Sequence, residues 1–436
     1  MTYKLSKWNS YISLGVRSGL IYNALADSFV AVKKASDDFV NAREEKIDLF
    51  SEAFREQLIE SGALVPEDMD ETGELERLIG EIDGDDSCFQ LIVNPTLDCN
   101  FHCWYCYENH IKDSVMSPDL VNGVVKMVAR RLSEQNNMRF LHLSFFGGEP
   151  LLRYDEVVLP LVHAVHDLCS KNGVVMTLHF TTNSFLLTDN MIRALSDYQA
   201  SFQITLDGGR ECHDNTRFGS GKKPSFDVIL DNIRKLSLSG MKVTLRVNFT
   251  GKNLESTREI IEILGSFPPE CRKNIKVDYQ RVWQDSESRD NQKIIGKVRG
   301  FRKRLRELGY SASNSRTLNM VRDSCYGDKT NELVVNFNGD IYACTARDFK
   351  PSDRLGHLSV TGDIEWNETL LSKRRSCRLV KPVCRNCRIA PICGGGCRTK
   401  CMEQSHHDGC NMGYDDEKID SLILERFEER FLNECE

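Results

Sequence analysis

Six short apolar runs alternate with amphipathic segments between Ser87 and about Gly309, and this alternation limits the possible folds more than any other feature. The runs that predict strands are Phe89–Thr96, Phe140–Phe146, Val174–Thr181, Ser201–Leu206, Lys242–Phe249 and Ile275–Trp283. The helical patterns between them include Asp119–Leu132, Asp155–Ser170, Asp189–Asp197, Phe226–Leu238 and Glu255–Leu264. Successive β-α units predict an α/β fold with a parallel sheet and right-handed crossovers. Ligands are then expected at the carboxyl ends of the strands.

Local signals add detail to this pattern and divide the chain into three predicted domains, 1–86, 87–309 and 310–436. Ser117 and Pro118 predict the N-cap and first position of a helix. Residues 1–86 predict a small α+β domain. It begins with strands Tyr3–Leu14 and Gly19–Val32, separated by a turn at Gly15 and Gly19. The elements that follow are a helix Lys46–Glu60, a wing-like turn Ser61–Asp70, a helix Glu71–Glu81 and an acidic linker 81–86. After Tyr310, Asn338-Gly339 predicts a hairpin between Glu332–Phe337 and Asp340–Cys344, and Tyr414–Asn433 predicts an amphipathic helix.

The overall composition is that of an ordinary globular protein. The chain has 436 residues, of which 40% are hydrophobic and 28% charged, and its net charge of −7 argues against a nucleic-acid partner. No apolar run approaches the roughly 20 residues needed to cross a bilayer, and the first residues lack an apolar signal segment. We therefore expect a cytoplasmic protein with no membrane partner.

The number of cysteines departs from this ordinary composition. The chain contains 17, of which 12 lie from Cys212 onward and eight between Cys344 and Cys410. A disulfide framework does not suit a chain without a secretion signal. Thiolates are good ligands for zinc and iron, so the sequence predicts metal binding.

The first cysteine group follows the first predicted strand and consists of Cys99, Cys103 and Cys106. Three thiols spaced by three and two residues can converge on one 4Fe–4S cube, which normally takes four cysteines, so one iron would stay open. The alternative from these residues alone is a structural zinc site completed by His102 or by a distant residue.

This cysteine group, with an aromatic residue before its last cysteine, resembles the signature of the radical S-adenosylmethionine (SAM) superfamily. Four further motifs follow in the order of that family, each at or in a predicted strand: Gly147-Gly148-Glu149-Pro150, Thr181-Thr182-Asn183, Thr205-Leu206-Asp207-Gly208 and Arg246-Val247-Asn248. Individually, these glycines and Asp207 could belong to ordinary turns.

The resemblance implies a partial (β/α)6 TIM-like barrel, a 4Fe–4S cluster held by the three cysteines and catalysis through a 5′-deoxyadenosyl radical. It implies a SAM site formed by Gly147, Gly148, Glu149, Pro150, Asn183, Asp207 and Arg217. The Glu149 carboxylate would suit the amino group of SAM and the Arg217 guanidinium its carboxylate. Taken alone, Arg217 would be an ordinary surface charge.

The second cysteine group resembles the SPASM extension of the same superfamily, which carries two auxiliary 4Fe–4S clusters. By this resemblance Cys384, Cys387, Cys393 and Cys410 hold the second auxiliary cluster, and Cys325, Cys344 and Cys397 hold the first. A zinc ribbon formed by Cys384, Cys387, Cys393 and Cys397 is the alternative. The fourth position of the first auxiliary cluster is open to a substrate thiolate, Cys377 or Cys401, while Cys88, Cys169, Cys212, Cys271 and Cys435 are expected to be incidental thiols.

The resemblance further implies a maturase that cross-links a ribosomally made precursor peptide, with residues 1–86 as a winged-helix-like domain that binds its leader by strand addition. A thioether is preferred because of the open cluster position, and a carbon–carbon or ether link is the second choice. A sulfatase-maturing enzyme is disfavoured because Thr345 stands where such relatives have an aspartate. The expected electron donor is a flavodoxin or ferredoxin, the candidate bases are Asp348, Asp340 and Glu108, and a non-enzymatic zinc or electron-carrier protein is the rival class.

Overall fold

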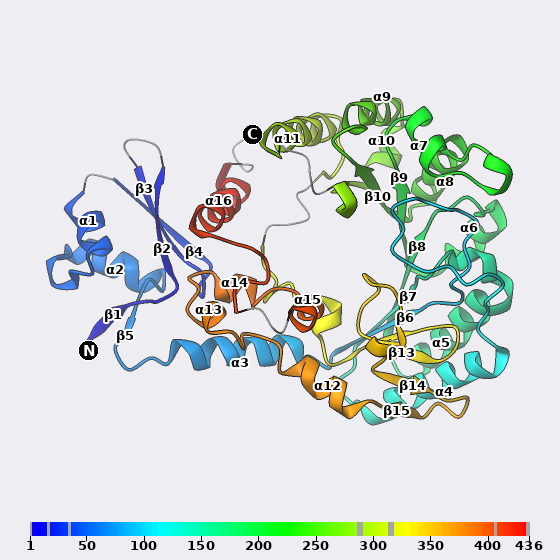
Figure 1. Ribbon diagram of the computed structural model, residues 1–436, viewed down its shortest axis with the longest axis horizontal. Helices are drawn as coiled ribbons and strands as arrows, with labels where there is room; N and C mark the ends of the chain where they lie inside the picture. Colours follow the sequence, from blue (N-terminus) through cyan, green and yellow to red (C-terminus); the bar gives the residue numbers. More distant parts are fainter. Residues whose placement is uncertain are drawn as a thin grey trace. The chain divides into compact units, whose positions relative to one another are not determined.

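The computed structural model describes residues 2–14, 18–33, 36–285, 291–312, 318–404 and 408–432 (Figure 1). Contacts divide the chain into two compact units. Unit 1 comprises Met1–Asp85, Arg316–Thr330 and Thr369–Glu436, and unit 2 comprises Asp86–Ser315 and Asn331–Glu368. Unit 2 begins at the predicted boundary near residue 86, whereas the contact division places residues 331–368 with the preceding β-α units.

Unit 2 is built on one ten-stranded sheet with the order β11-β10-β9-β8-β7-β6-β12-β13-β14-β15 (Figure 1). The six consecutive parallel strands are β6 (Cys88–Val93), β7 (Phe140–Phe145), β8 (Val175–Thr182), β9 (Ala200–Leu206), β10 (Lys242–Phe249) and β11 (Ile275–Arg281). The predicted α/β fold with a central parallel sheet is therefore confirmed.

The helices of unit 2 follow the five predicted helical patterns and add three more, the short α7 and α10 and the longer α11. They are α4 (Pro118–Glu134), α5 (Leu159–Lys171), α6 (Asp189–Leu195), α7 (Arg210–Thr216), α8 (Phe226–Leu238), α9 (Arg258–Gly265), α10 (Pro269–Arg272) and α11 (Asn291–Glu307). The Ser117 hydroxyl accepts a hydrogen bond from the Leu120 amide at 3.2 Å, and Pro118 is the first residue of α4, as predicted.

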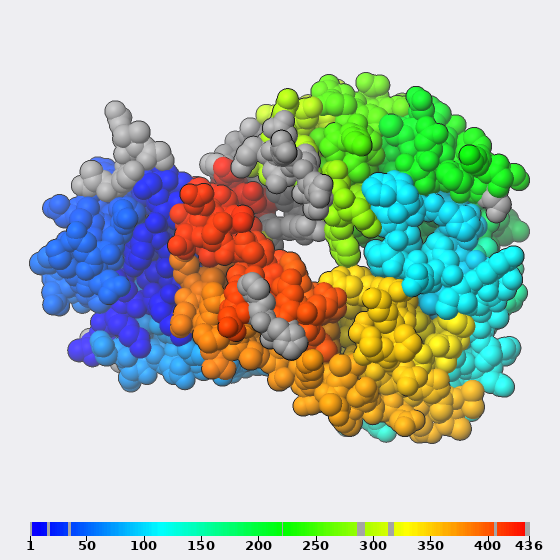
Figure 2. Space-filling view, in the orientation of Figure 1, coloured from blue at the N-terminus to red at the C-terminus, as the bar shows by residue number. Residues whose placement is uncertain are grey.

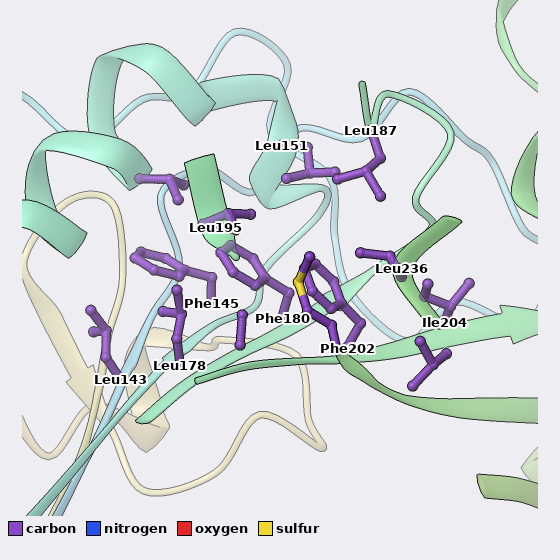
Figure 3. Close-up of a cluster of buried hydrophobic side chains, with 14 of the residues drawn as sticks. Leu143, Phe145, Leu151, Leu178, Phe180, Leu187, Leu195, Phe202, Ile204 and Leu236 are labelled. Carbon is purple, nitrogen blue, oxygen red and sulfur yellow. The ribbon is translucent and has the colours of Figure 1, made fainter. Parts of the chain in front are cut away.

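Side chains alternate along the parallel strands, so that one face of the sheet is apolar and the other polar. On the apolar face Phe180 stacks between Phe145 and Phe202 with ring centroids 5.3 and 5.1 Å apart (Figure 3). Burying each such ring stabilises the fold by roughly 1.5–3 kcal/mol. Half-buried polar residues such as His142, His179 and Arg246 occupy the alternate positions.

A segment far along the chain continues the sheet beyond β6. Strand β12 (Glu332–Val335) pairs in parallel with β6, and β13 (Asp340–Tyr342), β14 (Gly356–Leu358) and β15 (Ile364–Trp366) add antiparallel strands. The predicted turn at Asn338-Gly339 joins β12 to β13, with Gly339 at a φ of +88°. This hairpin is therefore part of the main sheet of unit 2.

The N-terminal part of unit 1 has more strands than predicted. Strand β1 (Tyr3–Leu5) pairs with β5 (Leu64–Pro66), and β2 (Asn9–Leu14), β3 (Ser18–Asn23) and β4 (Ser28–Lys33) form an antiparallel sheet. The prediction of two long strands was wrong because each apolar run contains a turn. In the second run the Asn23 side chain accepts a hydrogen bond from the Ala26 amide at 2.8 Å, and Asp27 has a φ of +55°. Gly15, in the predicted turn, lies outside the described residues.

The helical predictions for this region were also partly wrong. The predicted helix Lys46–Glu60 is a short 3-10 turn, η1 (Ile47–Leu49), followed by α2 (Glu52–Glu60), because Ser51 between them is extended with a ψ of 149°. Helix α1 (Asp37–Arg43) was not predicted. Helix α3 (Glu71–Asp83) takes up half of the predicted acidic linker.

The cysteine-rich part of unit 1 is made of short helices. These are α12 (Glu368–Arg375), α13 (Pro382–Arg385), α14 (Ala390–Cys393), α15 (Arg398–Glu403) and α16 (Asp416–Phe427), followed by the π-helical turn η9 (Glu428–Leu432). The predicted C-terminal helix thus begins at Asp416, and its predicted end, Asn433, lies outside the described residues. No helix in the described part of the chain is long and apolar enough to cross a membrane.

One hydrophobic core joins the two ends of the chain within unit 1. It contains Leu20 and Tyr22 of β3, Leu75 and Ile79 of α3, and, from the C-terminal segment, Ile389, Ile392, Ile419 and Ile423. Figure 2 shows the N-terminal residues in blue lying against the C-terminal residues in orange and red. The N-terminal sheet and the cysteine-rich segment therefore depend on each other for burial.

Candidate active site and cysteine sites

The loop after β6 carries Cys99, Cys103 and Cys106 at the carboxyl end of the sheet. The buried ring of Phe101 anchors this loop, and its amide donates to Cys99 Sγ at 3.4 Å. Burial raises the pKa of the Cys99 and Cys103 thiols, so these groups ionise readily only when a cation binds them. Cys106 is exposed, and His110 Nε2 lies 3.6 Å from its sulfur.

The loop after β7 depends on two glycines. A Cβ on Gly147 would lie 2.4 Å from the Thr96 carbonyl oxygen, and one on Gly148 would lie 2.1 Å from the Asp98 carbonyl oxygen. Gly147 also has a φ of +92°. No other residue fits at these positions, so the predicted motif brings the loop against the segment that leads into Cys99.

The Glu149 carboxylate is completely buried and accepts hydrogen bonds from within the protein. Its donors are Thr182 Oγ1 at 2.6 Å, the Asn183 amide at 2.8 Å and the Leu151 amide at 3.0 Å. These bonds join the ends of β7 and β8, which gives Glu149 a structural role in addition to its predicted contact with SAM. Asn183 Nδ2 in turn donates to Asn100 Oδ1 at 2.7 Å and links the motif to the cysteine loop.

A buried polar cluster forms where the ends of β9 and β10 meet the cysteine loop. The Tyr105 hydroxyl donates to Asp207 Oδ2 and accepts from Arg217 Nη1 at 2.8 Å and from Asn248 Nδ2 at 3.2 Å. Burial raises the pKa of Asp207, and both Asp207 Oδ1 and Arg217 Nε are buried without a hydrogen-bond partner in the described residues. An unpartnered carboxylate oxygen and guanidinium nitrogen suit a ligand that carries both donors and acceptors.

A cavity of about 250 Å³ lies beside this polar cluster. Its lining residues are Trp104, Tyr105, Asp207, Cys212, Asn215, Thr216, Asn248, Thr250, Asn253 and Val282. Tyr105 is the aromatic residue before the last cysteine of the first group, and Asn248 ends the motif in the fifth predicted strand. Neither was predicted as a site residue. Cys212, expected to be incidental, lines the cavity as well.

Two of the three candidate bases lie together near the cysteine loop. The Asn109 amide donates to Asp348 Oδ1 at 3.3 Å, and burial together with the charge of Asp348 raises the pKa of Glu108 to about 8. The third candidate, Asp340, instead pairs with Arg354 and His357, each at 3.1 Å. The structure therefore groups Glu108 with Asp348 and places Asp340 elsewhere on the sheet.

Residues 93–264, which carry the three-cysteine loop and the strand-end motifs, match the family model of the radical SAM superfamily. The chain therefore contains a radical SAM domain. It is 24% identical over 374 residues to the cysteine-type anaerobic sulfatase-maturating enzyme of Clostridium novyi, covering 79% of this chain and 94% of that protein. This radical SAM chain therefore has relatives among the maturases.

Solved structures share its fold. The structure of anSMEcpe with bound AdoMet has a TM-score of 0.52 and 18% identity, covering 74% of this chain and 92% of that one. The structure of Streptococcus suis SuiB bound to S-adenosylmethionine also has a TM-score of 0.52, with 16% identity, covering 92% of this chain and 97% of that one. A further SuiB structure contains the precursor peptide SuiA.

A radical SAM domain implies one 4Fe–4S cluster and SAM, and the residue types gathered in unit 2 suit both groups. Cys99, Cys103 and Cys106 share one loop and provide thiol donors, the ligands that iron–sulfur clusters prefer. In the same unit, Asp207 Oδ1 offers an unused acceptor and Arg217 Nε an unused donor, which suit the amino and carboxylate groups of SAM. The individual SAM contacts of Gly147, Gly148, Glu149, Pro150, Asn183, Asp207 and Arg217 stay predictions.

A second cavity, of about 510 Å³, lies in unit 1 and is lined by four of the predicted cluster cysteines, Cys384, Cys387, Cys393 and Cys410. The rest of its lining is mostly apolar and includes Ala390, Met412 and Ile419. Burial, with the other thiols adding to it, raises the pKa of Cys384 to about 11 and that of Cys393 to about 12. Four thiols around one cavity suit either a 4Fe–4S cluster or a zinc ion, so the second auxiliary cluster stays a prediction.

Three consecutive left-handed glycines connect Cys393 to Cys397. Gly394, Gly395 and Gly396 have φ values of +62°, +83° and +80°. A Cβ on Gly394 would lie 2.9 Å from Arg378, and one on Gly396 would lie 2.9 Å from Met412. Only glycine combines this backbone with these close approaches.

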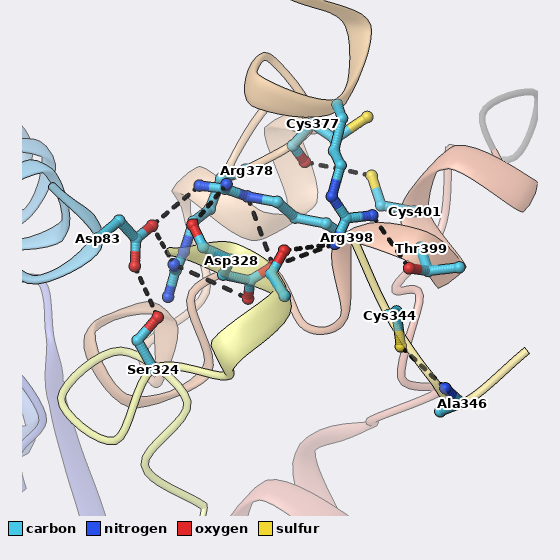
Figure 4. Close-up of polar contacts among 12 residues, drawn as sticks. Asp83, Ser324, Asp328, Cys344, Ala346, Cys377, Arg378, Arg398, Thr399 and Cys401 are labelled. Atoms are coloured by element: carbon cyan, nitrogen blue, oxygen red, sulfur yellow. Dashed lines mark hydrogen bonds and ion pairs between the residues drawn. The ribbon is translucent and has the colours of Figure 1, made fainter. Parts of the chain in front are cut away.

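The remaining cysteines fall into several environments. Cys325 and Cys397 belong to unit 1 and Cys344 to unit 2, so their shared cluster stays a prediction. Cys401 Sγ donates to the Cys377 carbonyl oxygen at 3.2 Å (Figure 4). The others are Cys169 and Cys271, which are buried in the core, Cys88, which is half-buried, and Cys435, which lies outside the described residues.

A buried charge cluster lies at the end of α3, among segments that carry cysteines. The Asp83 carboxylate accepts from Ser324 Oγ at 2.6 Å, from Arg398 Nη2 at 2.9 Å and from Arg378 Nη1 (Figure 4). The side chains of Asp83 and Arg378 are only 7% and 5% exposed. Because Ser324, Arg378 and Arg398 are chain neighbours of Cys325, Cys377 and Cys397, this cluster fixes three cysteine-bearing segments of unit 1.

Proposed function

We propose that this radical SAM enzyme holds three 4Fe–4S clusters and installs a cross-link, preferably a thioether, in a precursor peptide. The observation that carries the proposal is the apolar cavity lined by Cys384, Cys387, Cys393 and Cys410 in a chain that also has a radical SAM domain. Auxiliary clusters are useful to an enzyme whose product is more oxidised than its substrate, because such a reaction releases electrons.

When bound, the first cluster and SAM would supply the 5′-deoxyadenosyl radical that takes a hydrogen atom from the peptide. The auxiliary clusters would accept the electron that is released as sulfur bonds to carbon. Unit 2 orients SAM through the Tyr105, Asp207 and Arg217 cluster beside the 250 Å³ cavity. The thiol proton lost in forming the thioether passes to Asp348, because the raised pKa of its neighbour Glu108 keeps that group protonated near neutral pH. The polar face of the sheet, with His179 and Arg246, receives the peptide.

The preference for a thioether comes from the cysteine count of the first auxiliary site. Its predicted ligands are Cys325, Cys344 and Cys397, which leave one iron for a substrate thiolate. Iron coordination lowers the pKa of a thiol and fixes its sulfur. The rival ligands Cys377 and Cys401 contact each other, since the Cys401 thiol donates to the Cys377 carbonyl.

The N-terminal sheet of unit 1 is the proposed site for the leader of the peptide. Its strand order is β2-β3-β4, and its two faces are covered by separate hydrophobic cores. The sheet edges at β2 and β4 are therefore the places where an extended peptide could add a strand. The relative SuiB binds a precursor peptide, SuiA, which supports a peptide substrate here.

Formylglycine formation, the activity in the name of the Clostridium novyi relative, is the second candidate. Its similarity over 94% of that protein favours it. Against it stands Thr345, a buried residue in the place of the expected aspartate. In both activities a flavodoxin or ferredoxin is the proposed electron donor, and the cytoplasm the proposed location.

The test uses anaerobically reconstituted protein and the short peptides encoded beside its gene. Three full clusters correspond to about 12 iron per chain, and dithionite should produce 5′-deoxyadenosine. Replacing Cys99, Cys103 and Cys106 with Ala should abolish this cleavage and leave the other clusters bound. A peptide product that is lighter by two hydrogen atoms and has one free thiol fewer indicates a thioether. A product that reacts with an aldehyde-specific probe indicates formylglycine. Iron near 4 per chain together with bound zinc would refute the three-cluster proposal.

A further inference from the structure

One lysine contacts both sides of Cys410. Lys381 Nζ lies 2.6 Å from Asn411 Oδ1 and 3.4 Å from the Gly409 carbonyl oxygen, and these two residues flank Cys410 in the sequence. The same ammonium lies 3.3 Å from the Gln404 carbonyl oxygen. A charged donor with several acceptors on one segment holds that segment more firmly than a neutral hydrogen bond does.

Lys381 is also tied to the segment that carries the first two cysteines of the cavity. It is the N-cap residue of α13 and precedes Cys384 by three residues. The Cys384 amide donates to the Lys381 carbonyl oxygen at 2.9 Å. The lysine therefore joins the backbone that positions Cys384 to the backbone on both sides of Cys410.

The contacts continue to the third segment of the cavity. Asn411 is 4% exposed, and its Nδ2 atom lies 3.4 Å from the carbonyl oxygen of Gly395, in the turn that follows Cys393. Lys381 and Asn411 thus connect all three segments that supply the four thiols. Cys410 is farthest along the chain from the other three cysteines, and the position of its backbone needs the most support.

We propose that Lys381 is a positioning residue for the second auxiliary cluster: its ammonium fixes Cys410 so that this thiol completes the set of four. The inference rests on the proposed function, since it assumes that the four cysteines hold a cluster. Removing residues that orient metal ligands typically weakens metal binding about 10- to 100-fold. Lys381→Met should therefore speed the loss of one iron from this cluster by about the same factor.

The experiment compares full-length variants after identical anaerobic reconstitution. Iron release to a chelator and the electron paramagnetic resonance signal of a three-iron cluster after mild oxidation are the two measurements. Cys410→Ala serves as the reference for a lost fourth thiol, and Lys381→Met should approach it. Lys381→Arg should recover part of the stability, and Asn411→Ala should show a smaller defect of the same kind, which provides a second variant if Lys381→Met folds poorly.

Lys242 in unit 2 is the matched control. Its Nζ atom also contacts an asparagine oxygen, Asn274 Oδ1 at 2.9 Å, and a backbone carbonyl, that of Lys273 at 3.3 Å, but neither partner flanks a cysteine. Lys242→Met should release iron like the parent protein. Equal iron release from Lys381→Met and Lys242→Met would overturn the inference while leaving the proposed function in place. A parent protein with about 4 iron per chain would overturn both.

Discussion

Removing the Asp83 carboxylate tests the buried charge cluster of unit 1 directly. In Asp83→Ala, Arg378 and Arg398 lose the carboxylate that accepts from both of them and keep Asp328, whose carboxylate lies 3.9 Å from Arg378 and 3.6 Å from Arg398. Breaking one partner out of a buried ion pair typically costs about 3–5 kcal/mol, because a charge stays buried without compensation. Asp83→Asn keeps an acceptor for Ser324 and should show a smaller loss.

The cost can be read from the melting temperature. For a unit of this size, 1 kcal/mol shifts the midpoint by roughly 2–4 °C, so Asp83→Ala should lower it by about 6–20 °C. Apo and cluster-loaded protein must be compared separately, because a bound cluster stabilises the folded state. Hydrogen exchange should show the loss of protection first in α3 and in residues 318–330, whose backbones meet at Asp83.

Arg77 on the same helix supplies the control. It pairs with Glu74 and Glu81 on the surface, where its side chain is 54% exposed. Exposed pairs contribute little in water, so Arg77→Ala should leave both the midpoint and the exchange pattern close to those of the parent. If Arg77→Ala and Asp83→Ala shift the melting midpoint equally, the burial of Asp83 does not increase the contribution of its ion pairs to stability, and the reasoning fails.

Three further outcomes follow from the sites. Tyr105→Phe removes the hydroxyl shared by Asp207, Arg217 and Asn248. Each lost hydrogen bond to a charged group is worth roughly 1.5–3 kcal/mol, so the dissociation constant for SAM should rise about tenfold or more in equilibrium dialysis. Gly395→Ala places a Cβ at a φ of +83°, which costs about 1–2 kcal/mol, and should lower the iron content. Burial lowers the pKa of His179 to about 4 from its usual 6.5, so the unfolded chain takes up a proton before the folded one. Stability present above pH 6.5 should fall by up to about 3 kcal/mol as pH falls toward 4, and His179→Gln should flatten this acid limb in urea unfolding.

The sequence predicted unit 2 well because its signals are local. Strand β10 and helix α8 have the predicted bounds, Lys242–Phe249 and Phe226–Leu238, since side-chain alternation and helical periodicity are continuous there. The four cysteines that line the 510 Å³ cavity are the ones that the resemblance to the SPASM extension had grouped together. The turn at Asn338-Gly339 was predicted from residues that tolerate its backbone.

The features that were missed depend on residues far apart in the chain. Tyr105, Arg217 and Asn248 come from three different segments, and no local pattern indicates that they meet at one hydroxyl group. Asp83 was read as part of a charged linker, because its arginine partners lie about 300 residues away. The N-terminal apolar runs concealed turns because apolar content does not drop where the chain reverses at Asn23.

The composition of unit 1 from three separated stretches has a consequence for biosynthesis. The residues that cover one face of the N-terminal sheet, such as Ile419 and Ile423, are translated long after the sheet itself. At about 5–20 residues per second, the interval is on the order of 15–75 seconds. During that time one apolar face of the N-terminal sheet stays uncovered, and the cysteine segments that pack against it cannot take their folded positions. We therefore expect chaperone protection of the N-terminal sheet during this interval, and completion of the cavity lined by Cys410 only once the residues around Ile423 have been made.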